Sequence, residues 1–291
     1  MKAGTKIEKT REVVLKLLRE HEAENGLPTI GRFLFYELEQ RGLAVKPDRD
    51  GPRKGMRRTL GWPPGYQDVT DTLMQLRKDG SIPWDWVADI ERSVAIWGHW
   101  PSATAFMNEK LDSFRLNPWE PDEPPLILTE AKGNAKVLEK VAWEYCCPIS
   151  GLRGHAGGHL RTEIAPPLED NNRAVLYLGD YDRSGFDIEQ NARRVLEQTT
   201  GRNIEWVRIG LTLKQINAKK IKPIWKVDGR DGEGRDAWEC EALGQAGVTE
   251  LVRQTLQARL RRDRGCSIRS VHERERAERD KIERALRRLR I

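Results

Sequence analysis

The fold is decided by the stretch Arg173-Ala-Val-Leu-Tyr-Leu-Gly-Asp-Tyr-Asp-Arg-Ser-Gly185. It begins with a short run of apolar, β-branched and aromatic residues, which is typical of a buried strand. Two acids, Asp180 and Asp182, end this run, and Gly185 and a helical pattern follow directly. Ligands of open α/β sheets bind at the carboxyl ends of strands, and Mg²⁺ prefers carboxylate oxygens. Two interpretations stay open here: a pair of magnesium ligands, or a helix-capping Asp beside a turn Asp.

Strand and helix patterns alternate on both sides of this stretch. The sequence predicts strands over 126–130, 148–151 and 204–209, and helices over 134–145 and 184–198. This order is typical of an α/β fold with a mostly parallel, Rossmann-like sheet covered by helices. A charged, glycine-rich loop is expected over 229–235, and the chain reads as helical from Val248 onward.

The N-terminal part has a different texture, with helices predicted over 6–24, 29–42, 66–79 and 102–114. The stretch 46–58 is basic and includes Arg53, Lys54, Arg57 and Arg58. Helices with such a loop suit a winged-helix-like domain on a phosphate backbone, although a solvated loop fits equally well. The proline-rich segment 117–125 cannot continue a helix and is interpreted as a linker.

These patterns predict an organisation in three parts. A winged-helix-like domain spans 1–116, an α/β metal-binding domain spans 126–246, and a basic helical arm spans 247–291. The arm alternates arginine with acids, which favours an exposed helix with i,i+4 ion pairs, or else an arm that binds DNA or oligomerises.

The bulk composition narrows the class of protein. The 291 residues carry a net charge of +6, with 33% charged and 38% hydrophobic residues, which allows a real core and favours a polyanionic partner. No apolar run is long enough for a membrane span, and the first residues predict a polar helix rather than a signal peptide. The four cysteines form no C-x-x-C pair, so an intracellular protein without a zinc site or a disulfide framework is expected.

The helix predicted over 29–42 presents two faces at 100° per residue. Phe33, Leu34 and Leu38 fall on one side and form its core face. Arg32 and Tyr36 fall on the opposite side, one turn apart. Tyr36 is therefore predicted to be accessible.

Acids end two of the predicted strands, because Glu130 follows the first as Asp180 and Asp182 follow the third. Parallel strands bring these ends to one edge of the sheet, so the three carboxylates are expected to converge. Crowded carboxylates repel one another unless a cation lies between them. The sequence therefore predicts a site for one or two Mg²⁺ ions.

The motifs together resemble a known family. Thr129-Glu130-Ala-Lys-Gly133, Gly154 and Gly179-Asp-Tyr-Asp-Arg-Ser-Gly185 look like a Toprim domain, and Glu239-Cys-Glu-Ala-Leu243 is similar to a region near its end. Arg32-Phe-Leu-Phe-Tyr36 matches the Arg-x-x-[Phe/Tyr]-Tyr motif of the topoisomerase VI A subunit and of meiotic double-strand-break proteins.

This resemblance implies an enzyme that cleaves double-stranded DNA by tyrosine transesterification, leaving a 5′-phosphotyrosyl end. Tyr36 would be the nucleophile, with Arg32 stabilising the phosphate or orienting the phenol. In that family the tyrosine of one subunit meets the metal of another, so a homodimer is expected. The chain holds no nucleotide-binding motif, so ATP-driven strand passage would need a separate ATPase subunit of the B type. A cytoplasmic, nucleoid-associated location follows from these expectations.

Alternatives remain at the level of sequence. The protein could be a Toprim nuclease that uses metal-activated water, with Tyr36 not catalytic, or a noncatalytic DNA-binding adaptor. Arg153 and His155, in a glycine-rich loop beside the sheet edge, are candidate phosphate contacts, and a structural or capping role suits them equally.

Overall fold

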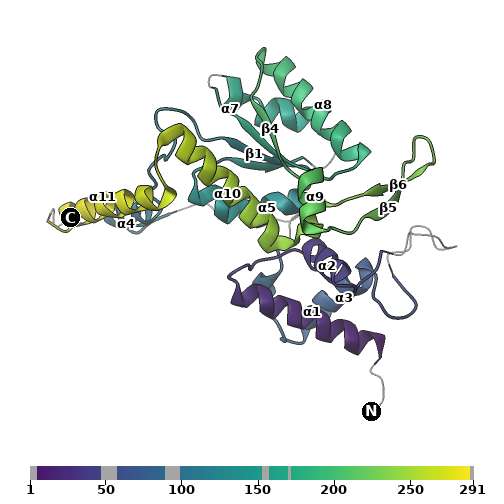
Figure 1. The fold of residues 1–291 in the computed structure, drawn as a ribbon. Coiled ribbons are helices and arrows are strands. Elements are labelled where there is room, and N and C mark those ends of the chain that lie inside the picture. The colour runs from purple at the N-terminus through teal and green to yellow at the C-terminus, as the bar shows by residue number, and fades with distance from the viewer. Residues whose placement is uncertain (1–4, 47–57, 89–98, 153–156, 170–171, 289–291) are drawn as a thin grey trace.

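A four-stranded sheet, with all its strands parallel, lies at the centre of the molecule (Figure 1). The computed structural model describes residues 5–46, 58–88, 99–152, 157–169 and 172–288. The strand order is β2-β1-β3-β4. The strands are β1 (Leu126–Thr129), β2 (Ile149–Gly151), β3 (Val175–Leu178) and β4 (Trp206–Gly210). The predicted α/β class and parallel sheet are confirmed.

Helices cover both faces of the sheet, because side chains alternate between the two faces along each strand. Ile127 and Leu176 belong to one buried cluster, and their neighbours Leu128 and Tyr177 belong to the other. The first cluster is completed by α5 (Lys132–Glu144) and α10 (Gly244–Arg264). The second is completed by η2 (Leu160–Ile164), α7 (Pro166–Glu169) and α8 (Arg183–Thr200), which follow the short α6 (Gly157–His159).

The two C-terminal helices, which the sequence analysis assigns to one arm over 247–291, have different surroundings. Val248, Val252, Leu256 and Leu260 of α10 are fully buried against the sheet, so α10 belongs to the sheet core. The boundary predicted after residue 246 thus falls inside this helix. Gly265, with a φ of 62°, ends α10 in the left-handed region that glycine tolerates best. Only α11 (Ile268–Arg288) projects, beside α4 (Ala103–Asp112), as Figure 1 shows.

The N-terminal region is helical and rests on the sheet through its second helix. It contains α1 (Lys6–Ala23), α2 (Gly31–Gln40), α3 (Tyr66–Lys78) and the short η1 (Trp84–Trp86). Leu34 and Leu38 of α2 pack into the helical core, as the wheel predicts. Phe33 instead joins the cluster beneath the sheet. Because α2 contributes to both cores, it joins the two regions. Among the described residues, no helix combines the length and apolar character needed to cross a bilayer.

An antiparallel hairpin was not predicted. It consists of β5 (Ile224–Val227) and β6 (Gly234–Ala237), and it follows α9 (Leu213–Lys219). A turn of 3₁₀ helix, η3 (Cys240–Leu243), connects it to α10. Glycine, aspartate and alanine are depleted in strands, so the short β6, Gly234-Arg-Asp-Ala237, reads as part of the charged loop.

The start of α9 provides a stability prediction. Thr212 Oγ1 accepts a hydrogen bond from the Gln215 backbone amide, and Gln215 Oε1 accepts one from the Thr212 amide at 2.9 Å. This capping box satisfies two helix-terminal donors. Thr212→Ala is expected to lower the free energy of unfolding by about 1 kcal/mol in urea titrations. Thr212→Ser, which keeps the hydroxyl, is the matched control, and equal stability of both variants would contradict the role of the cap.

Candidate functional site

The carboxyl ends of β1 and β3 meet at one edge of the sheet, as predicted from their parallel pairing. Thr129 pairs with Leu178, so Glu130 and Asp180 leave their strands side by side. Glu130 Oε2 accepts a hydrogen bond from the Asp180 backbone amide at 2.9 Å. The Asp180 side chain is buried and accepts a hydrogen bond from the Cys240 amide at 2.8 Å.

The contact between Asp180 and the Cys240 amide places two more acids, Glu239 and Glu241, beside Asp180. The sequence analysis did not assign these two acids to the metal site. Asp180, Glu239 and Glu241 each offer a carboxylate oxygen, and these atoms all lie within 4.8 Å of one another. All three residues are buried, with Glu241 fully inaccessible. We call them the acidic trio. Glu130 and Asp182, the other two predicted ligands, lie beside the trio rather than within it.

A backbone bridge explains why Glu239 and Glu241 reach this place. Tyr181 and Trp238 exchange two backbone hydrogen bonds, of 2.8 and 3.2 Å, in an antiparallel bridge. This bridge places the segment after β6 beside the residues that follow β3. The available signal was the Glu-x-Glu spacing, which repeats the Asp-x-Asp spacing of residues 180–182. The spacing alone does not show that residues 239–241 lie beside residues 180–182, because the hairpin that brings them there is not evident from the sequence.

Asp182 is the helix-capping Asp of the second interpretation given in the sequence analysis. Its Oδ1 accepts a hydrogen bond from the Gly185 amide at 2.6 Å and thereby caps α8. Its other oxygen forms an ion pair with Lys226 Nζ at 2.5 Å. Lys226 also lies 3.8 Å from Glu239 Oε1, so it connects Asp182 to the trio.

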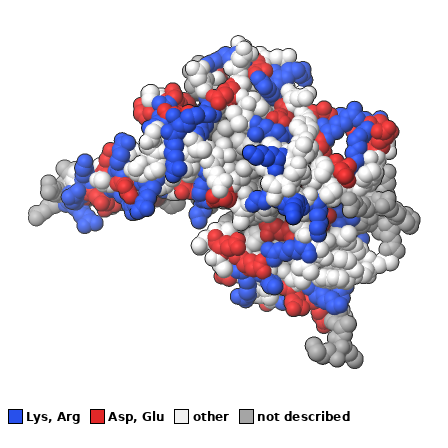
Figure 2. Space-filling model, viewed as in Figure 1, with Lys and Arg blue, Asp and Glu red and all other residues white. Residues whose placement is uncertain are grey.

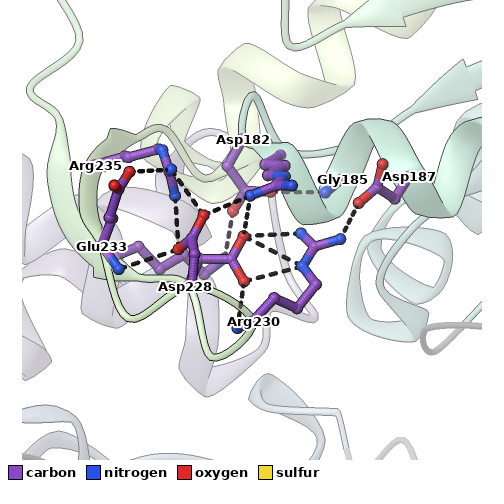
Figure 3. Close-up of polar contacts among 10 residues, drawn as sticks. Asp182, Gly185, Asp187, Asp228, Arg230, Glu233 and Arg235 are labelled. Carbon is purple, nitrogen blue, oxygen red and sulfur yellow. Dashed lines mark hydrogen bonds and ion pairs between the residues drawn. The ribbon is translucent and has the colours of Figure 1, made fainter.

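The hairpin loop is tied to the first turn of α8, as the close-up in Figure 3 shows. Arg183 Nη1 lies 3.2 Å from Asp228 and 2.7 Å from Asp231, and Arg230 pairs with Asp187 and Asp228. These contacts hold β5 against α8. Lys226, on β5, is therefore kept within reach of Asp182.

Two further cations enter the site from the N-terminal region. Arg32 Nη2 binds Glu239 Oε2 and lies 3.9 Å from Asp180 Oδ2, and Arg32 Nε lies 2.7 Å from Glu241 Oε1. Lys46 Nζ lies 3.3 Å from Glu239 Oε1. The acidic trio is thus covered by the side chains of α2 and of the segment that follows it.

The electrostatics of the trio follow from its burial. Removal from water raises the pKa of Asp180 well above its usual range, and the neighbouring Glu239 and Glu241 raise it further. Burial also raises the pKa of Glu241, against the opposing effect of Arg32. Burial alone would raise the pKa of Glu239, but the charges of Arg32, Lys226 and Lys46 outweigh it and hold that pKa low. Full ionisation of the trio therefore requires compensating positive charge.

The donor set fits a hard divalent cation. All three members supply carboxylate oxygens, which Mg²⁺ prefers. Glu241 Oε2 is buried and has no hydrogen-bond partner among the described residues. A buried acceptor without a partner is costly, so this oxygen has coordination capacity to spare. The trio could therefore hold a metal ion.

The prediction that Tyr36 is accessible is wrong. Only 5% of the residue is exposed, because its ring packs into the helical core against Phe35 and the remaining side of α2 faces the acidic trio. The Arg32 guanidinium lies 5.5 Å from the Tyr36 ring centre, as expected one turn away. Lys46 Nζ donates to the Tyr36 hydroxyl at 3.3 Å. Burial raises the pKa of Tyr36 well above its usual value, and the nearby Glu239 adds to this effect.

The predicted phosphate contacts are only partly within the described residues. Arg53, Lys54, Arg57, Arg153 and His155 lie outside them. Arg58 is exposed and forms an ion pair with Asp71 of α3 at 2.6 Å. No protein-family model, curated protein or solved structure matches this chain.

Proposed function

We propose that this protein is a Mg²⁺-dependent enzyme that cleaves the phosphodiester backbone of double-stranded DNA. The acidic trio supports this proposal, since three buried carboxylates with an unsatisfied oxygen suit a cation at the carboxyl edge of a parallel sheet. Mg²⁺ bound there would polarise the phosphate and stabilise the leaving oxygen. The resemblance to Toprim domains of the topoisomerase VI A type supports the same reaction class.

The position of Tyr36 favours transesterification. Lys46 contacts both the Tyr36 hydroxyl and Glu239 at 3.3 Å, so the phenol and the trio share one cation within a single chain. Tyr36 Oη would attack phosphorus while the bond from phosphorus to the 3′ oxygen breaks and that oxygen takes up a proton. Lys46 would stabilise the phenolate, and Arg32 would bind the phosphate.

Access to DNA requires α2 to separate from the trio. Arg32 contacts the trio directly, and the Tyr36 hydroxyl is connected to it through Lys46. A movement that exposes the trio would therefore also expose the Tyr36 hydroxyl, while its ring stays packed in the helical core. The burial of Tyr36 is for this reason compatible with its role as a nucleophile. In the family it resembles, the tyrosine comes from the partner subunit of a homodimer.

Tyr36→Phe tests this step. The wild-type protein, incubated with Mg²⁺ and end-labelled duplex DNA and then denatured, is expected to leave protein attached to 5′ ends. Tyr36→Phe should leave none, because it lacks the attacking oxygen and retains the ring packing. Tyr66→Phe, on α3, is the matched control and should form the adduct normally. An adduct that persists in Tyr36→Phe would reject this nucleophile.

A second candidate is hydrolysis by metal-activated water. The raised pKa of the buried Tyr36 favours it, since a phenol that stays protonated is a poor nucleophile. In the same assay, hydrolysis would give cleaved DNA without attached protein, and Tyr36→Phe would cleave normally. A protein that binds DNA but never cleaves it under any metal condition would instead be the noncatalytic adaptor.

A further inference from the structure

One segment holds an excess of positive charge equal to the net charge of the whole chain. From Trp206 to Val227 there are six basic residues and no acid, and the chain as a whole carries +6. Lys214, Lys219, Lys220 and Lys222, in and after α9, are exposed. Figure 2 shows Lys and Arg side chains gathered around α9.

These four lysines, which we call the α9 lysines, lie within nine residues of one another and carry charge without an acidic partner in the described part of the chain. None of the four forms an ion pair with an acid of the described residues, whereas Arg230 and Arg235 of the neighbouring hairpin are paired with aspartates. Lys222 Nζ instead donates to the Gln40 backbone carbonyl at 3.3 Å. Charge without an internal partner is available to an external anion.

A cleft of about 190 Å³ lies directly beside this charge. One wall comes from the end of α2 and the segment after it, and the other from the start of β5. Its lining residues are Glu39, Gln40, Ala44, Val45, Lys46, Lys222, Pro223, Ile224 and Trp225. The cleft therefore combines two lysines with an aromatic ring at the junction of the two regions.

Trp225 is held as a partly exposed platform. The residue is 39% exposed although it lies within β5. Its indole packs against Gly234 of β6, where a Cβ atom would lie only 2.3 Å from the ring. Glycine at this position thus permits the ring to lie against the hairpin backbone. A fixed aromatic face loses little entropy when a second ring stacks on it.

Lys46 connects the cleft to the acidic trio. It lines the cleft, and its Nζ also contacts Glu239 and the Tyr36 hydroxyl. A strand whose phosphate binds Lys46 in the cleft would therefore approach the trio with its next phosphate. Lys222 thus links the exposed lysines to the cleft, and Lys46 links the cleft to the candidate metal site.

We infer that this cleft binds an unpaired nucleotide of a single-stranded DNA segment, with the base stacked on Trp225 and the flanking phosphates on Lys46 and the α9 lysines. Base stacking on aromatic rings beside a basic groove is the common mode of single-strand recognition. The inference deepens the proposed function, on which it rests, by assigning double-stranded DNA with a locally unpaired strand as the substrate. Binding itself requires neither the metal nor cleavage.

Binding is measured by fluorescence anisotropy of a labelled oligothymidylate, in EDTA, against the matched duplex. Trp225→Ala is expected to weaken single-strand binding about tenfold, within the range for loss of one stacked base. Trp225→Phe should retain most of the affinity. Trp84→Ala, which removes an exposed tryptophan of the N-terminal region, is the matched control and should bind normally.

The charge is tested through salt dependence. Replacing Lys219 and Lys220 together with alanine should reduce the slope of log affinity against log salt by about 1.4, which is about 0.7 per lost phosphate contact. Asp180→Asn should bind as the wild type does, even if it cleaves nothing. Failure of cleavage with intact Trp225-dependent binding would thus count against the proposed function alone.

Two results would overturn the inference. One is wild-type affinity for the single strand in Trp225→Ala, with circular dichroism showing that the variant is folded. The other is equally tight binding of polyglutamate, which would show that the lysines recognise acidic peptide and that stacking has no part. A preference for duplex over single strand that is independent of Trp225 would count against it in the same way.

Discussion

Asp180→Asn is expected to reduce Mg²⁺-dependent DNA cleavage by more than about 100-fold. Loss of even an outer partner of a metal ligand costs about 10–100-fold in affinity or activity, and Asp180 is central to the trio. Asparagine keeps the shape and can still accept the hydrogen bond from the Cys240 amide. The loss should be seen with either chemistry, since both depend on the same ion. Cleavage rates at saturating Mg²⁺ measure it.

The control distinguishes the trio from the acids beside it. Asp187→Asn, on the first turns of α8, removes a carboxylate that pairs with Arg230 in the hairpin network. It should cleave at the wild-type rate, because Asp187 is not part of the trio. If Asp180→Asn cleaves normally while Asp182→Asn does not, the metal site would lie at Asp182 and Glu130, outside the trio.

Arg32→Ala is expected to lower the free energy of unfolding by about 3 kcal/mol in EDTA. Removing one partner of a buried ion pair leaves an uncompensated charge and costs about 3–5 kcal/mol. The lower end applies because the Arg32 side chain is 38% exposed, while Glu239 and Glu241 are almost completely buried. Urea unfolding monitored by circular dichroism measures the change.

Mg²⁺ should restore much of this stability, because the ion would supply the charge that Arg32 provides. A ligand that binds only the folded state stabilises it by about 2.7 kcal/mol at 100 times its dissociation constant. Arg11→Ala is the matched control, since Arg11 pairs with Asp79 at an exposed site and its loss should cost at most about 1 kcal/mol. Loss of stability in Arg32→Ala that Mg²⁺ leaves unchanged would contradict competition between the arginine and a metal.

Arg32 therefore connects stability to the candidate chemistry. The cation that covers the trio belongs to α2, and α2 also carries Tyr36. In the described arrangement the Arg32 guanidinium supplies the positive charge that a metal ion would otherwise supply to the trio. A Mg²⁺ ion entering the trio would weaken the main ionic contact between the N-terminal region and the sheet, and would favour the exposure of both residues.

The sheet could be predicted because its signal is local. The two central strands, β1 and β3, are short apolar runs buried on both faces, and the helices that follow them, α5 and α8, are long and periodic. The stretches 126–130 and 173–178 are therefore recognisable in isolation. The acids that end those strands could be placed for the same reason, since parallel pairing fixes which ends meet. Glu130 and Asp180 lie together accordingly.

The hairpin was missed because its strands have no such signal. They are short, carry Lys226, Arg235 and Asp236, and bury little on their own. Their pairing depends on Gly234 accommodating Trp225 and on ion pairs to α8, which join residues about 45 positions apart. Glu239 and Glu241 follow this hairpin, and their arrival at the trio could not be predicted without it.

The sequence by itself determined the parallel sheet, the helices around it and the edge at which acids gather, because strand and helix periodicity depend only on near neighbours along the chain. Tertiary structure alone decided which acids form the trio, that Tyr36 is buried, and that Arg32 covers the site. A wheel separates the two faces of α2, but it cannot show that both are covered. Arg32 covers the trio because buried carboxylates require positive charge, and it lies more than 200 residues away from Glu239 along the chain.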